Sequence, residues 1–373
     1  MKTNEIIGLE RSEKTFKPWL PKRVLFTPDA MEEVYGQELY SLVQEQNIPI
    51  EILKANRLTN LKGKDERETY RLAKTTLAVV KAPPSQLRLQ PIPPSADWQF
   101  HLAQGCPAHC HYCYLAGSLS GPPVIRVNAN LPAILENLKN YIEPNKLTTF
   151  EASCYTDPLS IEHLTGGLQK TISFFGQLQN AQLRFVTKFT AVEPLLPIQH
   201  NCNTRARLSI NAPEVAKKLE GGVPHISARI NALRKLALPK EEGGGGYPIG
   251  VVLAPIMPIL NWQEHYTSLL DDLAQALSFT ATSMVATSST PFPITALTFE
   301  LITHRFTEGS KNLLQEWYPN TSLDMTEDNR TKKFNKFGGT KYVYQKDLMK
   351  EMKTFFYNEI HSRFPEAVVL YWT

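Results

Sequence analysis

The sequence lacks any long apolar run. No stretch of about 18 or more apolar residues occurs in its 373 residues, so we expect no membrane span and no membrane partner. The first residues, MKTNEIIGLERSEKTFKPWLPKR, lack the apolar core of a secretory signal peptide. Together these absences favour a soluble protein of the cytoplasm.

Cysteine is scarce, and its count is odd. Only five cysteines occur, of which Cys106, Cys110 and Cys113 lie close together, whereas Cys154 and Cys202 stand alone. Such a set fits a disulfide framework poorly. It fits a metal or cluster site in a reducing compartment well.

A strong excess of either charge sign is also absent. The formal net charge of +4 permits a polyanionic partner without demanding one. The glycine-rich segment EEGGGGYP at 241–248 lacks the Gly-Lys-Ser/Thr of a phosphate-binding loop, so we interpret it as a connection.

The first part of the chain is predicted to hold three segments. Residues 1–20 are charged and aperiodic, which predicts a disordered arm. Residues 21–80 form a small α/β domain, since apolar runs at 24–26 and 48–53 flank a helical pattern, as in a β-α-β unit. Residues 81–97 carry five prolines and are expected to be an extended linker.

Residues 98–306 alternate strand and helix patterns. The strand candidates are Trp98–Ala103, Thr148–Ser153, Leu183–Lys188, Arg207–Ile210, Ile249–Pro255 and Leu297–Ile302. Helical patterns separate most of them, which predicts an α/β fold based on a partial, TIM-like (β/α)6 barrel. The active site of a barrel lies at the C-terminal ends of its strands.

Residues 307–373 are predicted to form a C-terminal extension of helices and a β-hairpin. The helical patterns cover 308–317 and 346–360, and AVVLYW is a terminal strand. Lysines flank the Gly-Gly turn in KFNKFGGTKYVY, as in a hairpin tip that touches an anion, although a solvated turn explains the same residues. The segment 280–295 is a low-complexity surface insertion.

The cysteines in GCPAHCHYCYL follow the first barrel strand with C-x3-C-x2-C spacing. Three thiolates ligate three irons of a [4Fe–4S] cluster and leave the fourth iron open to a small molecule. Structural zinc is the alternative, with His109 or His111 as the fourth ligand. The placement at the catalytic end of the barrel favours the cluster.

This spacing is the signature of radical S-adenosylmethionine enzymes. The segments CPAHCHYCYL, FEASCYTD, RFVTKF, RLSIN, LTFELITHRF and KYVY, in this order, resemble the spore photoproduct lyase family from about residue 20 to the C-terminus. The resemblance implies a radical lyase of DNA repair that opens a methylene-bridged thymine pair. Its cofactors would be a [4Fe–4S] cluster on Cys106, Cys110 and Cys113 and S-adenosylmethionine, the source of a 5′-deoxyadenosyl radical.

The resemblance also implies roles for single residues. Cys154 in FEASC matches the family's hydrogen-atom donor, and Tyr112 and Tyr114 match its hydrogen relay. By the same resemblance Thr156, Asp157, Lys188 and Ser209 contact S-adenosylmethionine; Lys188 would bind its carboxylate and Asp157 its ribose. Without the resemblance, Cys154 is core packing and Lys188 a surface lysine. Cys202 matches no family cysteine and is interpreted as structural.

The hairpin departs from the family pattern. Lys336 and Phe337 stand where better-known members carry Arg-Tyr, so the charge for a phosphate is kept and the bidentate fork is lost. Lys336, Phe337 and Lys341 are the predicted substrate contacts.

The implied partners are DNA that contains a thymine photoproduct and a small-protein or flavoprotein electron donor; the enzyme is expected to be monomeric. Two other functions stay open. One is a radical enzyme for another lesion, RNA, a peptide or a small molecule. The other is a non-enzymatic zinc-binding protein.

Overall fold

The structure is a computed structural model that describes residues 16–119, 121–152, 154–278, 296–334 and 339–373. Most of the predicted N-terminal arm and the 280–295 insertion lie outside these residues. Among the helices of these ranges, none is long and apolar enough to cross a bilayer.

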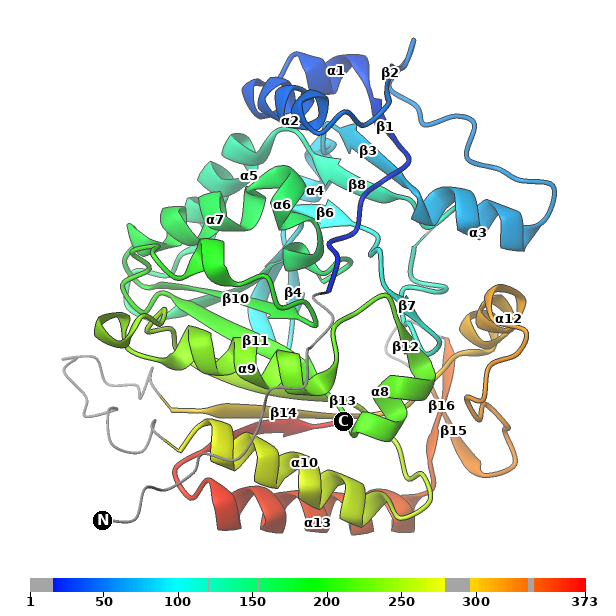
Figure 1. Cartoon of the computed structure of the whole chain (residues 1–373), viewed down its shortest axis with the longest axis vertical. Coiled ribbons are helices and arrows are strands. Elements are labelled where there is room, and N and C mark those ends of the chain that lie inside the picture. Colours follow the sequence, from blue (N-terminus) through cyan, green and yellow to red (C-terminus); the bar gives the residue numbers. More distant parts are fainter. Residues whose placement is uncertain (1–15, 120, 153, 279–295, 335–338) are drawn as a thin grey trace, which may run out of the picture.

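A curled sheet of eight strands forms the centre of the molecule (Figure 1). Its order is β17-β14-β13-β11-β10-β9-β5-β4. The bounds are β4 (Gln90–Ile92), β5 (Ala96–Phe100), β9 (Thr148–Ala152), β10 (Ala181–Thr187), β11 (Thr204–Ile210), β13 (Ile249–Ile256), β14 (Thr298–Thr303) and β17 (Val368–Trp372). All six predicted strands are present and parallel, so the predicted partial barrel is confirmed.

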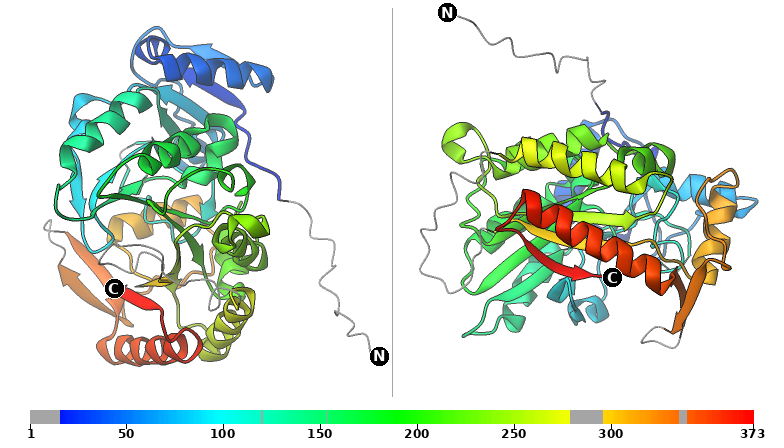
Figure 2. Two further views of the ribbon diagram at one scale, coloured as in Figure 1. Left: turned by 90° about the vertical axis from the view of Figure 1, so that its left-hand side faces the viewer. Right: turned by 90° about the horizontal axis from the view of Figure 1, so that it is seen from below.

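The central strands are buried on both faces, which explains why a strand such as β13 (IGVVLAPI) is an apolar run. Every residue of β11 is buried, and β13 is buried except at one position. The covering helices are α5 (Leu131–Leu138), α7 (Gly167–Gly176), α8 (Pro213–Leu219), α9 (Ile226–Ala237) and α10 (Trp262–Ala276). Helix α13 (Lys346–Arg363) lies beside α10, and the terminal strand β17 pairs with β14 as a further parallel strand (Figure 2).

A second sheet, of order β2-β1-β3-β8-β6, lies above the half-barrel in Figure 1. Its strands are β1 (Arg23–Phe26), β2 (Ile50–Ile52), β3 (Thr76–Val80), β8 (Ile125–Asn128) and β6 (Ala103–Gln104). The predicted β-α-β unit is present, since β1 and β2 are parallel and α1 (Pro28–Met31) and α2 (Val34–Glu45) connect them. However, β8 and β6 follow the linker in sequence, so the two predicted domains share this sheet.

The proline-rich linker is not extended throughout. Helix α4 (Pro84–Leu87) and strand β4 occupy it, because proline suits the first turn of a helix and the edge of a sheet.

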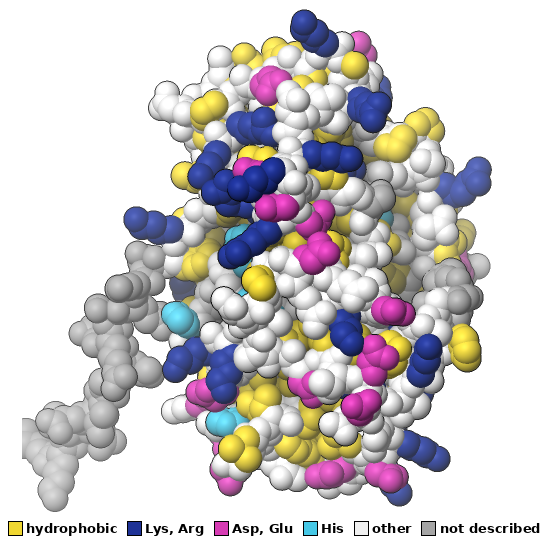
Figure 3. All heavy atoms as spheres, turned by 90° about the vertical axis from the view of Figure 1, so that its right-hand side faces the viewer, with side chains coloured by type: hydrophobic (Ala, Val, Ile, Leu, Met, Phe, Trp, Pro, Cys, Tyr) yellow, Lys and Arg dark blue, Asp and Glu magenta, His cyan; other side chains and the backbone are white. Residues whose placement is uncertain are grey.

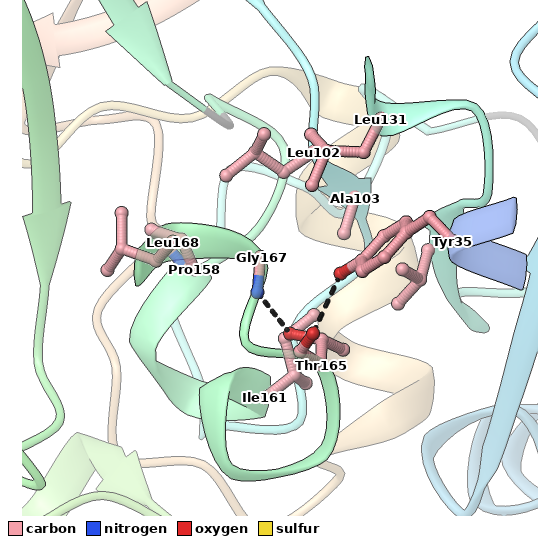
Figure 4. Close-up of a pocket in the computed structure, with 10 residues that line it drawn as sticks. Tyr35, Leu102, Ala103, Leu131, Pro158, Ile161, Thr165, Gly167 and Leu168 are labelled. Atoms are coloured by element: carbon pink, nitrogen blue, oxygen red, sulfur yellow. Dashed lines mark hydrogen bonds between the residues drawn. The ribbon is translucent and has the colours of Figure 1, made fainter. Parts of the chain in front are cut away.

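Helix α2 is fixed to the barrel by a small, well-packed contact (Figure 4). The Tyr35 hydroxyl donates to the Thr165 carbonyl at 2.9 Å, at the end of α6 (Glu162–Thr165). The cavity beside this contact has a volume of about 10 Å³ and a mainly apolar lining. Since that is about the space of one water, the cavity is a packing void and too small for a substrate.

The C-terminal extension carries the predicted helix and hairpin. Helix α12 (Glu308–Trp317) begins with a capping box between Thr307 and Ser310. Strands β15 (Arg330–Phe334) and β16 (Thr340–Tyr344) pair antiparallel, which confirms the hairpin; its tip at 335–338 lies outside the described residues.

Candidate active site at the mouth of the half-barrel

The cysteine loop begins at a position that only glycine suits. Gly105 has φ +80°, and a Cβ there would lie 2.4 Å from the Val124 carbonyl oxygen. Its backbone N–H donates to the Tyr155 carbonyl at 2.7 Å. The loop that carries Cys106 therefore starts against the segment that follows β9, at the C-terminal ends of the barrel strands.

A short antiparallel ribbon then holds the middle of the loop. Strand β7 (His109–Cys110) pairs with β12 (Glu220–Gly221), with Cys110 opposite Glu220. The His111 N–H extends the ribbon by donating to the Leu219 carbonyl at 2.9 Å. Neither strand was predicted, because two-residue strands carry no periodic pattern.

The three loop cysteines form one electrostatic group. Burial raises the pKa of the Cys106 thiol to about 12; Lys74 opposes this shift, and Asp157, Cys113 and Cys110 add to it. Burial also raises the pKa of Cys110 to about 11, opposed by Lys188. These thiols stay protonated until a metal binds them, because metal ligation requires the thiolate.

Zinc and a four-iron cluster make different demands on the cysteine loop. Zinc would need its ligand sulfurs about 2.3 Å from a single point. Within the described ranges, no group of three or more His, Cys, Asp or Glu side chains is arranged to hold one ion. A four-iron cluster demands less convergence, since each cysteine binds its own iron.

The two histidines of the loop have other partners. The His109 Nδ1 lies 2.9 Å from the Tyr70 hydroxyl, and Tyr70 also hydrogen bonds to Tyr318. The His111 ring stacks on Tyr318 at 4.3 Å, and its Nδ1 lies 2.9 Å from the Thr321 hydroxyl. Both rings thus serve the packing between α3 (Glu66–Lys74), the loop and the segment after α12.

Cys154 follows β9 at the mouth of the half-barrel, as predicted. Burial holds the pKa of its thiol far above the usual range, with Glu151 adding to the effect and Arg207 opposing it. The exposed Tyr114 donates its hydroxyl hydrogen to the Cys154 carbonyl. The thiol therefore keeps its hydrogen, and one predicted relay tyrosine contacts the backbone of Cys154.

Lys188 follows β10 and belongs to a buried charged group. Its Nζ lies 2.7 Å from Glu220 Oε1 and 2.5 Å from the Tyr112 hydroxyl. Tyr112 also hydrogen bonds to Glu220, and Arg229 Nη2 pairs with the second Glu220 oxygen at 2.5 Å. Two cations surround one carboxylate, which leaves a net positive charge for an anionic ligand.

The other predicted cofactor residues lie at the same edge of the sheet and are buried. Thr156 donates to the Gly105 carbonyl, and Ser209 lies within β11. Asp157 accepts from the Thr187 hydroxyl and the Lys188 N–H, both at 2.7 Å, while burial raises its pKa to about 6. In this structure Asp157 ties the β9 loop to the end of β10; its predicted ribose contact stays a prediction.

Sequence reasoning missed the charged groups behind the site. Inside the half-barrel, Arg207 pairs with Glu151 and Glu300, and Arg184 pairs with Glu300 at 2.6 Å. Lys74 and the Glu220–Arg229 pair were missed as well. Charged residues within predicted buried strands, as in RARLSI and TFELIT, could have indicated these buried ion pairs.

The hairpin presents basic side chains. Lys333 and Lys341 face each other across the two strands, and burial, Arg305 and Lys333 lower the pKa of Lys341. Figure 3 shows a face on which basic side chains are interspersed with acidic ones, without a continuous basic stripe. Two predicted contacts, Lys336 and Phe337, lie outside the described residues.

Cys202 is an exposed free cysteine two residues before β11. It therefore lies at the N-terminal end of that strand, whereas Cys154 follows the C-terminal end of a parallel strand. The two cysteines are at opposite edges of the same sheet.

Comparisons with known proteins agree with this arrangement. The family model described as spore photoproduct lyase matches residues 19–373. The curated spore photoproduct lyase of Geobacillus sp. is 38% identical over 96% of this chain and 100% of its own length; that of Bacillus subtilis is 37% identical over 95% and 99%. A solved variant with bound S-adenosylmethionine and dinucleoside spore photoproduct superposes with a TM-score of 0.86 at 38% identity, covering 96% of this chain and 100% of the other.

Proposed function

The chain belongs to the spore photoproduct lyase family, and we propose that it repairs the spore photoproduct in DNA by radical S-adenosylmethionine chemistry. One observation carries the proposal. The cysteine loop, Cys154 and Lys188 all lie at the C-terminal edge of one parallel sheet, after β5, β9 and β10 in turn. Cluster ligation, hydrogen donation and cofactor binding would then take place at the same end of the half-barrel.

Cys106, Cys110 and Cys113 would hold the cluster. The loop fits an anionic group better than a free cation, because Lys74, Lys188 and Arg229 act on its thiols. When bound, the cluster and S-adenosylmethionine supply the radical that removes a hydrogen atom from the lesion.

Lys188 is proposed to bind the carboxylate of S-adenosylmethionine. Its ammonium has three N–H donors, and Tyr112 and Glu220 occupy two of them. The third donor, and the net positive charge of the group, suit a carboxylate. Thr156 and Ser209 would line the same pocket with hydroxyl groups.

Cys154 is proposed to give a hydrogen atom to the thymine radical that remains after the bridge breaks. The reacting bond is Sγ–H, which the raised thiol pKa preserves at neutral pH. Tyr114 would return a hydrogen atom to Sγ, since it already reaches the Cys154 backbone. Tyr112 would follow in the relay, with its hydroxyl held by Lys188 and Glu220.

The hairpin is proposed to bind the DNA backbone. Lys341 and Lys333 offer neighbouring positive charges on paired strands, and Lys336 and Phe337 at the tip are the remaining predicted contacts. Phosphate contacts of this kind position a protein on DNA without reading its sequence.

The remaining partner assignments are part of the same proposal. We propose a cytoplasmic, monomeric enzyme that receives electrons from a small protein or flavoprotein. All five cysteines are free, which suits a reducing compartment.

A direct assay tests the function. Anaerobically reconstituted protein, S-adenosylmethionine and a reductant should convert a synthetic dinucleoside spore photoproduct to two thymidines. Cleavage of S-adenosylmethionine without consumption of this lesion would instead indicate another substrate, and a protein that binds zinc but no iron would contradict the radical chemistry.

A further inference from the structure

Lys74 is a buried cation without a carboxylate partner. It ends helix α3 and is only 6% exposed. Within the described part of the chain, none of the ion pairs includes Lys74, although lysine is rarely buried unless its charge is paired.

The contacts of the Lys74 ammonium within the described residues are with the cysteine loop and with an aromatic ring. Its Nζ donates hydrogen bonds to the carbonyl oxygens of Cys106 and Ala108. The same ammonium lies 5.4 Å from the centre of the Tyr70 ring. Carbonyl groups and a ring face solvate a cation, but they carry no net negative charge to balance it.

The acidic residues within helix α3, and the one that acts on the Cys106 thiol, have other partners. Glu66 Oε1 accepts a hydrogen bond from the Trp317 indole at 3.0 Å. Glu68 pairs with Arg71 at 3.7 Å and accepts from the Lys64 N–H at 2.8 Å. Asp157, which acts on the Cys106 thiol, is bound to Thr187 and the Lys188 backbone. The positive charge of Lys74 is therefore directed at the loop itself.

Lys74 is also held in place. The Tyr70 ring, four residues earlier on α3, stacks on Trp317 at 4.5 Å, so α3 packs against α12 beside the loop. Figure 1 shows both helices on the side of the molecule that carries β7. Asp65 caps the start of α3 by accepting from the Glu68 N–H at 2.7 Å. A charge on such a fixed support acts at a constant distance from the loop.

We propose that Lys74 is the counter-charge of the cluster, holds the loop in position, and makes the cluster easier to reduce. The inference rests on the proposed function, because it requires a [4Fe–4S] cluster on the three cysteines. A cluster with three thiolates is an anion, and reduction adds a further negative charge. A fixed cation stabilises the reduced form more than the oxidised form, so it raises the reduction potential.

The test compares variants at this position in the full-length, reconstituted protein. A redox titration followed by electron paramagnetic resonance, without S-adenosylmethionine or DNA, measures the midpoint potential. Lys74→Gln keeps an N–H donor for the loop carbonyls and removes the charge, so its potential should be more negative than that of wild type. Lys74→Arg keeps the charge and should remain near the wild-type value.

Lys64→Gln is the matched control. It makes the same change in net charge at an exposed position just before α3, where water screens the charge. Its potential should equal that of wild type. A Lys74→Gln potential equal to that of wild type would overturn the proposal. Lys74 would then only hold the loop in position through its hydrogen bonds.

Measurement of iron content covers the case in which a variant assembles little cluster. If Lys74→Gln and Lys74→Met fail to bind iron while Lys74→Arg loads normally, the charge is required, as proposed. If all three fail alike, the exact shape of lysine matters and the electrostatic role is refuted. Wild-type protein that binds no cluster would instead contradict the proposed function.

Discussion

The cysteine loop and the C-terminal hairpin differ in how the fold supports them. Contacts from α3, β12 and the segment after α12 hold the loop, and Cys110 is buried. The hairpin projects basic side chains, and Phe334 beside its tip is 82% exposed. Radical chemistry needs fixed distances between reacting atoms. Phosphate contact needs only an accessible positive charge, so it tolerates an exposed support.

This contrast predicts graded effects of mutation. Changes in the loop should abolish activity. Changes at the mouth of the half-barrel should alter the product of the reaction or the affinity for S-adenosylmethionine, and changes in the hairpin should weaken DNA binding by a modest, salt-dependent amount.

The largest effect is expected in the loop. Replacement of Cys106, Cys110 or Cys113 by alanine should abolish cluster assembly and S-adenosylmethionine cleavage, because each thiolate binds its own iron. Iron and sulfide content, measured after anaerobic reconstitution, checks this. Cys202→Ala, at the opposite edge of the sheet, is the control and should bind iron normally. A loop variant with a full, active cluster would remove that cysteine from the ligand set.

Cys154→Ala should change the product rather than stop the reaction. The cluster, S-adenosylmethionine cleavage and lesion consumption should persist, since the donor acts only after the lesion has opened. The unquenched thymine radical should then form adducts with the reductant or take hydrogen from solvent. More S-adenosylmethionine should also be consumed per lesion, because no thiyl radical forms to recover hydrogen from Tyr112 or Tyr114. Chromatography of the products measures both effects.

Clean thymine repair by Cys154→Ala at the normal rate would make this residue a packing cysteine. Tyr114→Phe sharpens the comparison. It removes the hydroxyl that contacts Cys154 and should raise S-adenosylmethionine consumption while thymine remains the product.

The sequence predicted the half-barrel well because its strands are buried on both faces. Apolar runs such as IGVVLAPI in β13 are visible without any knowledge of the neighbouring strands. The order of helices and strands then implied a parallel sheet, and the C-terminal strand ends gave the position of Cys154 and Lys188.

The unpredicted parts depend on contacts between distant segments. Cys110 and Glu220 pair across a ribbon of two residues a side, which is too short for a pattern. Lys74 ends helix α3, a position at which the helix dipole favours any lysine, so the sequence does not mark it as special. Its burial depends on the loop that folds over it. Similarly, β8 pairs with β3 in the N-terminal sheet although the two strands are far apart in the sequence.

A smaller effect is expected at Lys188. Lys188→Ala should weaken S-adenosylmethionine binding by about 1.5–3 kcal/mol, the usual contribution of a hydrogen bond to a charged group. That corresponds to roughly 10–150-fold in Kd. Calorimetry on the reconstituted protein measures it. Lys170→Ala, which removes an exposed ion pair with Glu38 elsewhere, is the control and should not change Kd. Equal affinity of Lys188→Ala and wild type would exclude Lys188 from the cofactor site.

The smallest effect is expected in the hairpin, where each substitution should remove a single phosphate contact. Lys341→Ala, and separately Lys336→Ala, should weaken binding of lesion-containing duplex DNA and reduce the slope of log K against log salt by about one unit each. Removal of one phosphate contact releases one fewer counterion, which is why the slope changes. Lys350→Ala, an exposed lysine on α13, makes the same charge change away from the hairpin and should leave the slope unaltered. Fluorescence anisotropy over a salt series distinguishes these outcomes. If all three variants share the wild-type slope, the hairpin does not contact DNA, and the lesion is bound only by residues at the mouth of the half-barrel. If Lys350→Ala lowers the slope as much as Lys341→Ala does, net charge rather than the hairpin governs DNA binding.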